Sequence, residues 1–251
     1  IIKHADIRRS LLNMKSIIEG QRSLAFWLSQ HVDVSLNHSN DRIRKNAEDL
    51  ISLLTPVIKS FFTDMGVEIT NEAIQVFGGY GYTKDQGIEQ LYRDNRITPI
   101  YEGTNSVQAI DLVFRKVLNN KILSDFILII RNEIKDDNGA IELKTFSKIL
   151  EKNLKYLEEF TRWLENKNKD KKDDVSSACN DFLKILGYVS LGFSWFKITK
   201  VSLDKLADNK NFYEEKINTS KYFYNKILPR IETHFNSALS GSDTIMNAKF
   251  N

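Results

Sequence analysis

One carboxylate in this sequence is surrounded by residues that suit proton transfer. Glu102 lies between Tyr101 and Gly103, on a predicted loop that leads into a helix, and loops held by rigid helices are common places for functional sites. Aromatic and glycine neighbours let a bound ligand exclude water from the carboxylate, which makes it a stronger base near neutral pH. Alternatively, Glu102 only interacts with the positive end of the following helix, a contribution of about 0.3–1 kcal/mol. The local sequence alone favours this second interpretation.

Other kinds of site lack their sequence patterns. Gly78 and Gly79 precede Gly81, but a dinucleotide-binding turn needs a preceding strand and G-x-G-x-x-G spacing, whereas residues 73–77 have a helical pattern. We interpret the glycines as a helix end and a turn. The four histidines are scattered, so no metal site is predicted. The G-x-S-x-G pattern of hydrolases is absent from the sequence.

A longer pattern surrounds Glu102 and is more specific. Residues 73–116 read AIQVFGGYGYTKDQGIEQLYRDNRITPIYEGTNSVQAIDLVFRK. This stretch resembles the C-terminal region of the acyl-CoA dehydrogenase family, in which a helix ends in Q-x-F/H-G-G-x-G, a Y/M-R-D-x-R/K helix follows, and I-Y-E-G-T comes next. The resemblance implies an FAD-dependent enzyme that converts an acyl-CoA thioester to a trans-2-enoyl-CoA.

The resemblance assigns roles to the residues around Glu102. Glu102 matches the family's glutamate base, which removes the α-proton of the substrate, and its backbone N–H matches the donor to the thioester carbonyl oxygen. Tyr101 and Gly103 match neighbours that shape the acyl pocket and so bind substrate. Thr104 matches a residue that contacts the flavin. With these matches, Glu102 is interpreted as a catalytic base.

Further matches concern the cofactor. Gln75, Gly78 and Gly79 match positions that meet the FAD adenosine and pyrophosphate of a partner subunit, and Gln108 matches a cofactor-binding position more weakly. Contacts of this kind imply a homo-oligomer, either a dimer or a tetramer.

The resemblance also implies partners. Acyl-CoA is the substrate and an electron-transferring flavoprotein receives the electrons; in acyl-CoA oxidases oxygen receives them instead, and the sequence leaves this alternative open. A non-catalytic helical interaction module or a DNA-binding homologue is a further alternative. The intact motif from Tyr101 to Thr104 and a net charge of +3 spread along the chain argue against both, so no nucleic acid is expected as a partner.

The Arg93–Asp94 pair is expected to fix its helix against a neighbouring helix.

Two other stretches extend the resemblance. Residues 3–28 and 219–246 are similar to the family subgroup with an extended helical C-terminus, which includes methylthiopropionyl-CoA dehydrogenases. We therefore expect a C-terminal-type helical domain at residues 1–118, with the base and part of the FAD site, and a helical extension at residues 119–251. The sequence opens on Ile1 without the family's N-terminal helical domain and β-domain. We expect this part alone neither to retain FAD nor to turn over substrate.

The elements that must position these residues are predicted to be helices. With 11 Gly and 3 Pro in 251 residues, the composition favours an all-α fold, and apolar residues at three- and four-residue spacings predict a helical bundle with additional C-terminal helices. Pro56 is expected to kink or break the second helix, and Asn71 to cap a short one. The predicted helical ranges are 2–31, 41–61, 71–77, 88–97, 105–118, 122–135, 140–166, 175–206 and 212–239.

The remaining features concern the core and the surroundings of the protein. Cys179 has no second cysteine to pair with and stands at an apolar spacing with Phe182, so a buried thiol and a cytoplasmic location are expected. The most apolar window, 182–198, is shorter than the ~20 residues that a membrane span needs, so no span is predicted. Within it, three aromatic residues are expected in the core: Phe193, Trp195 and Phe196. The mixed-charge run 166–174 is interpreted as a solvated connection between two helices.

Overall fold

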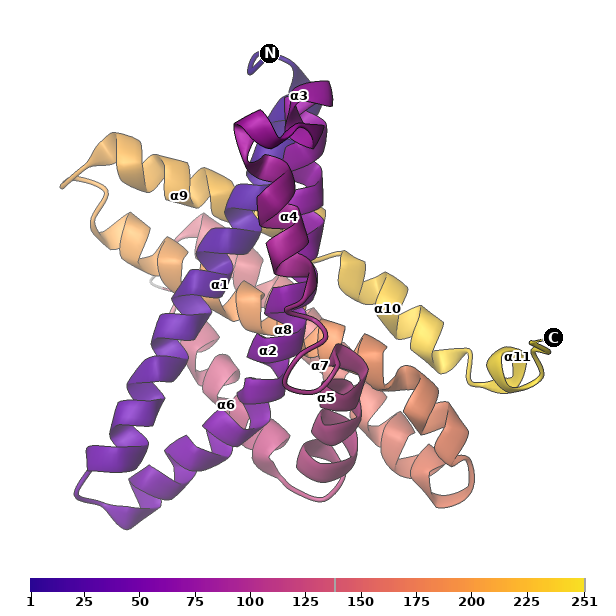
Figure 1. Cartoon of the computed structure of the whole chain (residues 1–251). Helices are drawn as coiled ribbons and strands as arrows, with labels where there is room; N and C mark the ends of the chain where they lie inside the picture. The colour runs from indigo at the N-terminus through magenta and orange to yellow at the C-terminus, as the bar shows by residue number, and fades with distance from the viewer. Residues whose placement is uncertain (138, 251) are drawn as a thin grey trace.

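Helices make up all the regular structure of the described residues, 1–137 and 139–250, in the computed structural model (Figure 1). The predicted all-α fold is therefore confirmed. The elements in chain order are α1 (Ala5–Asn37), α2 (Asp41–Phe77), α3 (Gly79–Tyr82), η1 (Lys84–Gln86), α4 (Ile88–Arg96), α5 (Asn105–Asp111), η2 (Leu112–Val117), α6 (Ile122–Lys135), α7 (Ile141–Asp170), α8 (Lys172–Asp204), α9 (Lys210–Tyr222), η3 (Phe223–Ile227), α10 (Arg230–Leu239) and α11 (Asp243–Met246).

The second helix is longer than its sequence pattern indicates. Asn40 caps it by accepting hydrogen bonds from the backbone N–H groups of Arg42 and Ile43, and the helix then runs unbroken to Phe77. Of the kink or break expected at Pro56, the break is therefore wrong, and so is the predicted cap at Asn71. A proline inside a helix costs about 3 kcal/mol, but burial of the apolar residues on either side of Pro56 offsets this cost. Asn71 is an exposed residue within the last turns of α2.

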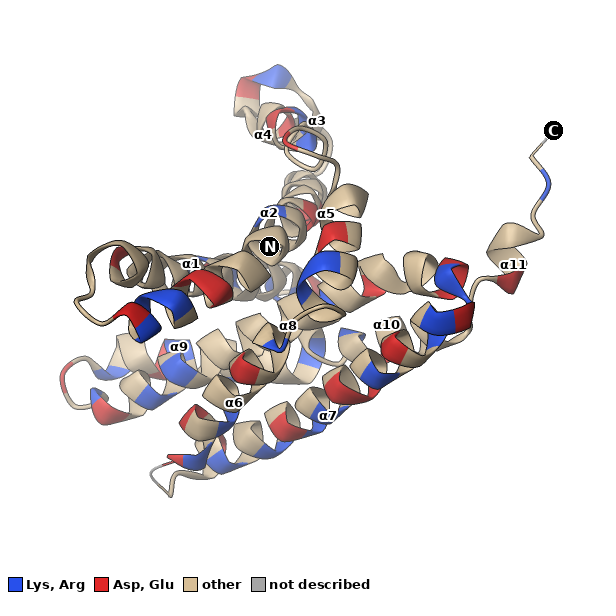
Figure 2. Ribbon diagram, turned by 90° about the horizontal axis from the view of Figure 1, so that it is seen from below, with Lys and Arg blue, Asp and Glu red and all other residues tan. Residues whose placement is uncertain are grey.

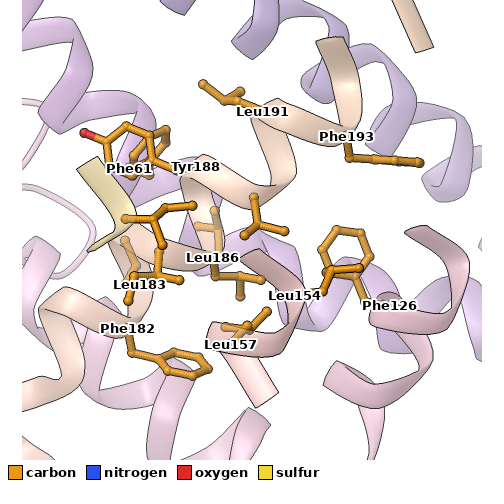
Figure 3. Packing of buried hydrophobic residues seen from close by; sticks show 14 of the residues in the cluster. Phe61, Phe126, Leu154, Leu157, Phe182, Leu183, Leu186, Tyr188, Leu191 and Phe193 are labelled. Carbon is orange, nitrogen blue, oxygen red and sulfur yellow. The ribbon is translucent and has the colours of Figure 1, made fainter. Parts of the chain in front are cut away.

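The centre of the molecule is α8, which packs against α1, α2, α5, α7, α9 and α10. Figure 3 shows its side chains meeting those of α2, α6 and α7, with the Phe61 ring against Tyr188. Close approach depends on glycine, because a Cβ added at Gly187 would lie 2.4 Å from the Phe61 ring. Trp195 is fully buried and donates from Nε1 to the Ser16 carbonyl oxygen of α1 at 2.9 Å. The predicted positions of three aromatic residues in the core are thus confirmed: Phe193, Trp195 and Phe196.

The single cysteine also lies in this core. Cys179 is 1% exposed, and burial raises the pKa of its thiol to about 12. The thiol is therefore held in its neutral form, as expected for a cysteine that packs as a small apolar residue.

The charged run at 166–174 is mostly exposed, as expected, but it lies within two helices and not in a separate connection. Helix α7 continues to Asp170, α8 begins at Lys172, and only Lys171 separates them. Asp174 is buried: its carboxylate accepts from the Ser242 backbone N–H at 2.9 Å, from the Ser242 hydroxyl at 2.7 Å and from Lys167 Nζ at 2.8 Å. The run forms helix and not loop for two reasons. Its lysine side chains can pack their stems along a helix surface while their charges stay in water, and its one buried aspartate, Asp174, is paired.

Two of the predicted helices are divided. Residues 212–239 form α9, the π-helical turn η3 and α10, and Pro229 precedes α10. Residues 105–118 form α5 followed by the π-helical turn η2. A π-helical turn has one residue more in its hydrogen-bonded ring than an α-helical turn. The three- and four-residue spacing of apolar residues alone does not indicate such a turn.

The helix α2 is, within the described residues, the one long and apolar enough to cross a membrane. Its apolar residues are in the core instead, since Leu53, Leu54 and Val57 are fully buried and the helix packs against α1 and α8. Core helices of globular proteins often have the same length and apolar composition, so these two properties of α2 are weak evidence for a membrane span.

Candidate functional site

The loop between α4 and α5 presents Glu102 at its tip. The loop is closed at its base, where the Asn105 backbone N–H donates to the Pro99 carbonyl oxygen at 3.0 Å, and Tyr101 N–H donates to the Ile97 carbonyl oxygen at 3.2 Å. Glu102 has φ 57°, the one positive φ of a non-glycine residue in the described chain, and Gly103 follows with φ 84°. A left-handed conformation at a residue with a side chain costs about 1–3 kcal/mol and is typical of functional sites. The left-handed backbone of Glu102 thus fixes the direction in which its exposed side chain points from the loop.

The backbone around Glu102 has unused donors. In the described residues, the N–H groups of Glu102, Gly103 and Thr104 donate to no protein acceptor. Consecutive exposed N–H groups next to left-handed residues form a concave surface that binds anions or carbonyl oxygens. The loop therefore combines a carboxylate with hydrogen-bond donors for an oxygen.

Side chains from two helices hold the loop in this shape. Gln108 of α5 donates from Nε2 to the Glu102 carbonyl oxygen at 3.0 Å, and Lys59 of α2 donates from Nζ to the Gly103 carbonyl oxygen at 2.7 Å. Thr104 caps α5 by accepting from the Val107 N–H at 3.4 Å. The capping role at this helix start thus belongs to Thr104.

The predicted site residues lie in two separate groups. Five of them share the loop and the start of α5: Tyr101, Glu102, Gly103, Thr104 and Gln108. The other three lie at the far end of α2: Gln75, Gly78 and Gly79. The loop is attached to α2 at Lys59, and Gly78 lies about 28 Å further along this helix at 1.5 Å per residue. Figure 1 shows this separation, with α3 at one end of the molecule and α5 near its middle.

The second group forms an open backbone surface. Gly78 ends α2 with φ 63°, and a Cβ added at Gly78 or Gly79 would meet nothing within 4 Å. Two tyrosines follow and are 75% and 82% exposed, Tyr80 and Tyr82. By contrast, a Cβ at Gly81 would lie 2.8 Å from the Ile74 carbonyl oxygen, so this third glycine serves packing. Gly78 and Gly79 leave room for a ligand to approach the main chain closely.

The Arg93–Asp94 pair does not have the expected contacts. Arg93 donates to Glu89 of its own helix at 2.6 Å, and both Arg93 and Asp94 are exposed. The prediction that the pair fixes α4 against its neighbour is therefore wrong. The contact of α4 with α2 includes Asn95 instead, whose side chain lies next to Gly66. An i, i+4 spacing on an exposed helix face favours the local ion pair.

The part of α2 that holds the loop is not among the predicted site residues. Lys59, Ser60, Thr63 and Asp64 form a polar row at helical spacing and face Asn105. The signal was present, because these polar residues interrupt an apolar helix face on which Val57, Phe61 and Met65 are buried. A polar row within a buried stretch needs a polar partner.

No group of three or more potential metal ligands of the His, Cys, Asp and Glu types occurs among residues 1–137 and 139–250. The site is therefore described by its carboxylate, its backbone donors and its open glycine surface.

Comparison with known proteins matches both halves of the chain. The family model described as "Acyl-CoA dehydrogenase, C-terminal domain" matches residues 1–117, and the model described as "Acetyl-CoA dehydrogenase C-terminal like" matches residues 126–249. The 3-methylmercaptopropionyl-CoA dehydrogenase of Ruegeria pomeroyi is 28% identical over 99% of this chain and 43% of the relative. The chain thus spans less than half the length of this relative.

Solved structures share the fold. An acyl-CoA dehydrogenase from Bacillus anthracis, solved with FAD, superposes with a TM-score of 0.71 at 18% identity, over 92% of this chain and 41% of that one. Acyl-CoA oxidase 1 of Arabidopsis thaliana superposes with a TM-score of 0.63 at 16% identity, over 95% of this chain and 38% of that one. These structures show the shared fold. The two family models, which together cover nearly all of the sequence, show that the chain belongs to the acyl-CoA dehydrogenase family and corresponds to its C-terminal helical region.

Proposed function

We propose that the protein containing this chain removes hydrogen from the α and β carbons of an acyl-CoA thioester to give a trans-2-enoyl-CoA, with Glu102 as the base. The observation that carries the proposal is the left-handed Glu102 at the tip of a braced loop, beside unused backbone N–H groups. The similarity to a 3-methylmercaptopropionyl-CoA dehydrogenase supports the class of substrate.

The chemistry needs both features of the loop. The α-proton of a thioester is too weakly acidic for a carboxylate unless the negative charge that develops on the carbonyl oxygen is stabilised. The Glu102 backbone N–H donates to that oxygen, while the Glu102 carboxylate takes the proton. Tyr101, which is 49% exposed, and Gly103 border the same carboxylate and shape the acyl site. Base and donor thus come from one residue, whose conformation fixes their relative geometry.

The cofactor in this proposal is FAD. When bound, it accepts the hydride that leaves the β-carbon. Thr104 and Gln108 would contact the flavin next to Glu102. At the other site, the adenosine and pyrophosphate of another subunit's FAD would be held by Gln75, Gly78 and Gly79. The distance of about 28 Å along α2 between the loop attachment and Gly78 supports two different flavin sites, and the open surface at Gly78 and Gly79 fits a closely approaching pyrophosphate.

The proposed assembly is a homo-oligomer, a dimer or a tetramer. Its support is the apolar surface near the second group, where Tyr80, Tyr82 and Leu91 are exposed, because exposed apolar patches commonly mark interfaces.

We further propose that the enzyme is cytoplasmic and that an electron-transferring flavoprotein is its electron acceptor. We also propose that the chain divides into a catalytic helical domain at residues 1–118 and an extension at 119–251.

The test is anaerobic bleaching of the flavin absorbance by a series of acyl-CoA thioesters, with the full-length, FAD-loaded protein that contains this chain and with its Glu102→Gln variant. We expect bleaching in the parent protein and its loss in the variant, since the amide is not a base. Glu214→Gln, on the exposed face of α9, serves as the matched control and should bleach normally. Bleaching that persists in Glu102→Gln would contradict the assigned base. Rapid oxygen consumption with substrate would assign the enzyme to the oxidases instead.

A further inference from the structure

Asn105, three residues after Glu102, has an unusually complete set of contacts. Its side-chain Nδ2 donates to Asp64 Oδ1 at 2.6 Å, to Thr63 Oγ1 at 3.0 Å and to the Ser60 carbonyl oxygen at 3.1 Å. Its Oδ1 accepts from Lys59 Nζ at 2.9 Å. All four partners lie within two turns of α2, so the amide is fully engaged with one helix and has no free donor for a substrate.

Lys59 connects this contact to the backbone next to Glu102. Its Nζ donates both to Asn105 Oδ1 at 2.9 Å and to the Gly103 carbonyl oxygen at 2.7 Å. The Gly103 carbonyl belongs to a residue that is itself left-handed. Charge-assisted hydrogen bonds are the stronger ones in proteins, so this ammonium is well suited to hold the second of two left-handed residues in place.

The tip of the loop needs such a support. Glu102 and its neighbours are exposed, and the left-handed conformation of a glutamate is intrinsically unfavourable. Without external contacts the residue would relax to an ordinary conformation, and its carboxylate and N–H would point elsewhere. Gln108 supports the Glu102 carbonyl oxygen, and the contacts of the loop with α2 come from Lys59 and Asn105, which together we call the clamp.

We propose that the clamp, Lys59 with Asn105, positions Glu102 for proton removal without touching the substrate. The catalytic part of this inference rests on the proposed function, whereas its structural part concerns only the conformation of the loop. Both clamp residues act as positioning residues, because their polar atoms are occupied within the protein. Misplacing a catalytic group by about 1 Å lowers the rate about 100-fold.

The test uses Asn105→Asp and Lys59→Met in the full-length, FAD-loaded protein that contains this chain. Asn105→Asp keeps the shape of the side chain but replaces the Nδ2 donor by an oxygen facing the Asp64 carboxylate, so the contact becomes repulsive. Lys59→Met keeps the stem and removes the donor, and it tests the clamp if Asn105→Asp folds poorly. Lys45→Met is the matched control, because Lys45 lies on the same helix and pairs with Asp49 at the surface.

Two measurements are made on each variant. The first is hydrogen–deuterium exchange of a peptide spanning residues 97–108, with a peptide of α8 as the reference for global stability. The second is steady-state kinetics with an acyl-CoA that bleaches the parent flavin. We expect faster exchange at 97–108, unchanged exchange in α8, and kcat lowered about 10- to 100-fold with KM changed less than about threefold. Lys59→Arg, which retains a donor, should recover part of kcat.

The outcomes separate the clamp from the proposed function. Unchanged exchange at 97–108 in both variants would overturn the clamp, as would a loosened loop with normal kcat in a protein that Glu102→Gln inactivates. Inactivity of the unsubstituted FAD-loaded protein toward every thioester would count against the proposed function. In that case the exchange data would still decide whether Lys59 and Asn105 hold the loop.

Discussion

The helices α8 and α4 use their apolar residues in opposite ways. Twenty of the 33 residues of α8 are buried, whereas none of the nine residues of α4 is. Yet α4 and the turn after it carry Leu91, Ile97 and Ile100, which are 56%, 54% and 46% exposed. The first helix is stabilised by contacts within this chain, and the second presents an apolar surface that this chain does not cover.

This difference separates residues that maintain the fold from residues available for function. Along α7, acidic and basic side chains alternate, which leaves the outer face of the bundle polar (Figure 2). The part of the chain from α3 through α4 to the loop that carries Glu102 combines exposed apolar residues with positive-φ glycines. Substitutions should therefore lower stability more at α8 than at α4.

The largest effect on stability is expected from Trp195→Ala. Trp195 is fully buried and hydrogen-bonded to the Ser16 carbonyl oxygen, and removal of a buried indole costs about 3–5 kcal/mol. Leu91→Ala on α4 should change the free energy of unfolding by less than about 0.5 kcal/mol. Urea denaturation followed by circular dichroism compares the two. Equal changes in the free energy of unfolding would mean that α8 and α4 contribute equally to stability, which would contradict the contrast.

Asp174→Asn should have the next largest effect, about 1–3 kcal/mol at neutral pH, because it removes a buried charge-assisted contact with Lys167. Lys167 and the Ser242 donors hold the pKa of Asp174 well below its usual range. The carboxylate therefore stabilises the fold above about pH 4, and this contribution is lost as the pH falls toward the folded-state pKa.

Denaturation of parent and Asp174→Asn proteins across this pH range measures the effect. The difference in stability should shrink below about pH 4. On α4, Glu89→Gln breaks a pair with Arg93 whose guanidinium side chain is 61% exposed, and should cost less than about 1 kcal/mol. A pH-independent difference for Asp174→Asn would refute the role of its charge.

Two glycines should differ by a similar amount. Gly187→Ala places a methyl group 2.4 Å from the Phe61 ring, and overpacking of this kind costs about 1–3 kcal/mol. Gly79→Ala meets no atom within 4 Å and should leave the unfolding midpoint unchanged while weakening FAD binding, measured by fluorescence titration of the full flavoprotein. Normal FAD affinity in Gly79→Ala would remove Gly79 from the proposed cofactor site.

The sequence indicated the core well, because burial in helices leaves a regular apolar spacing. The position of Trp195 and the loop that carries Glu102 follow from such spacings and from a specific motif. The continuity of α2 through Pro56 did not follow, since it depends on packing against other helices. The contacts of Asn105 with Lys59 join residues 46 positions apart, and local patterns carry no information on such pairs.

The unbroken course of α2 has a mechanical consequence. One rigid rod carries the attachment of the Glu102 loop near Lys59 and, about 28 Å further along, the Gly78–Gly79 surface. A tilt of about 5° at the Lys59 end displaces the other end by about 2.4 Å, because displacement grows with distance from the pivot. Small rotations at one proposed flavin site are thus amplified at the other by leverage alone.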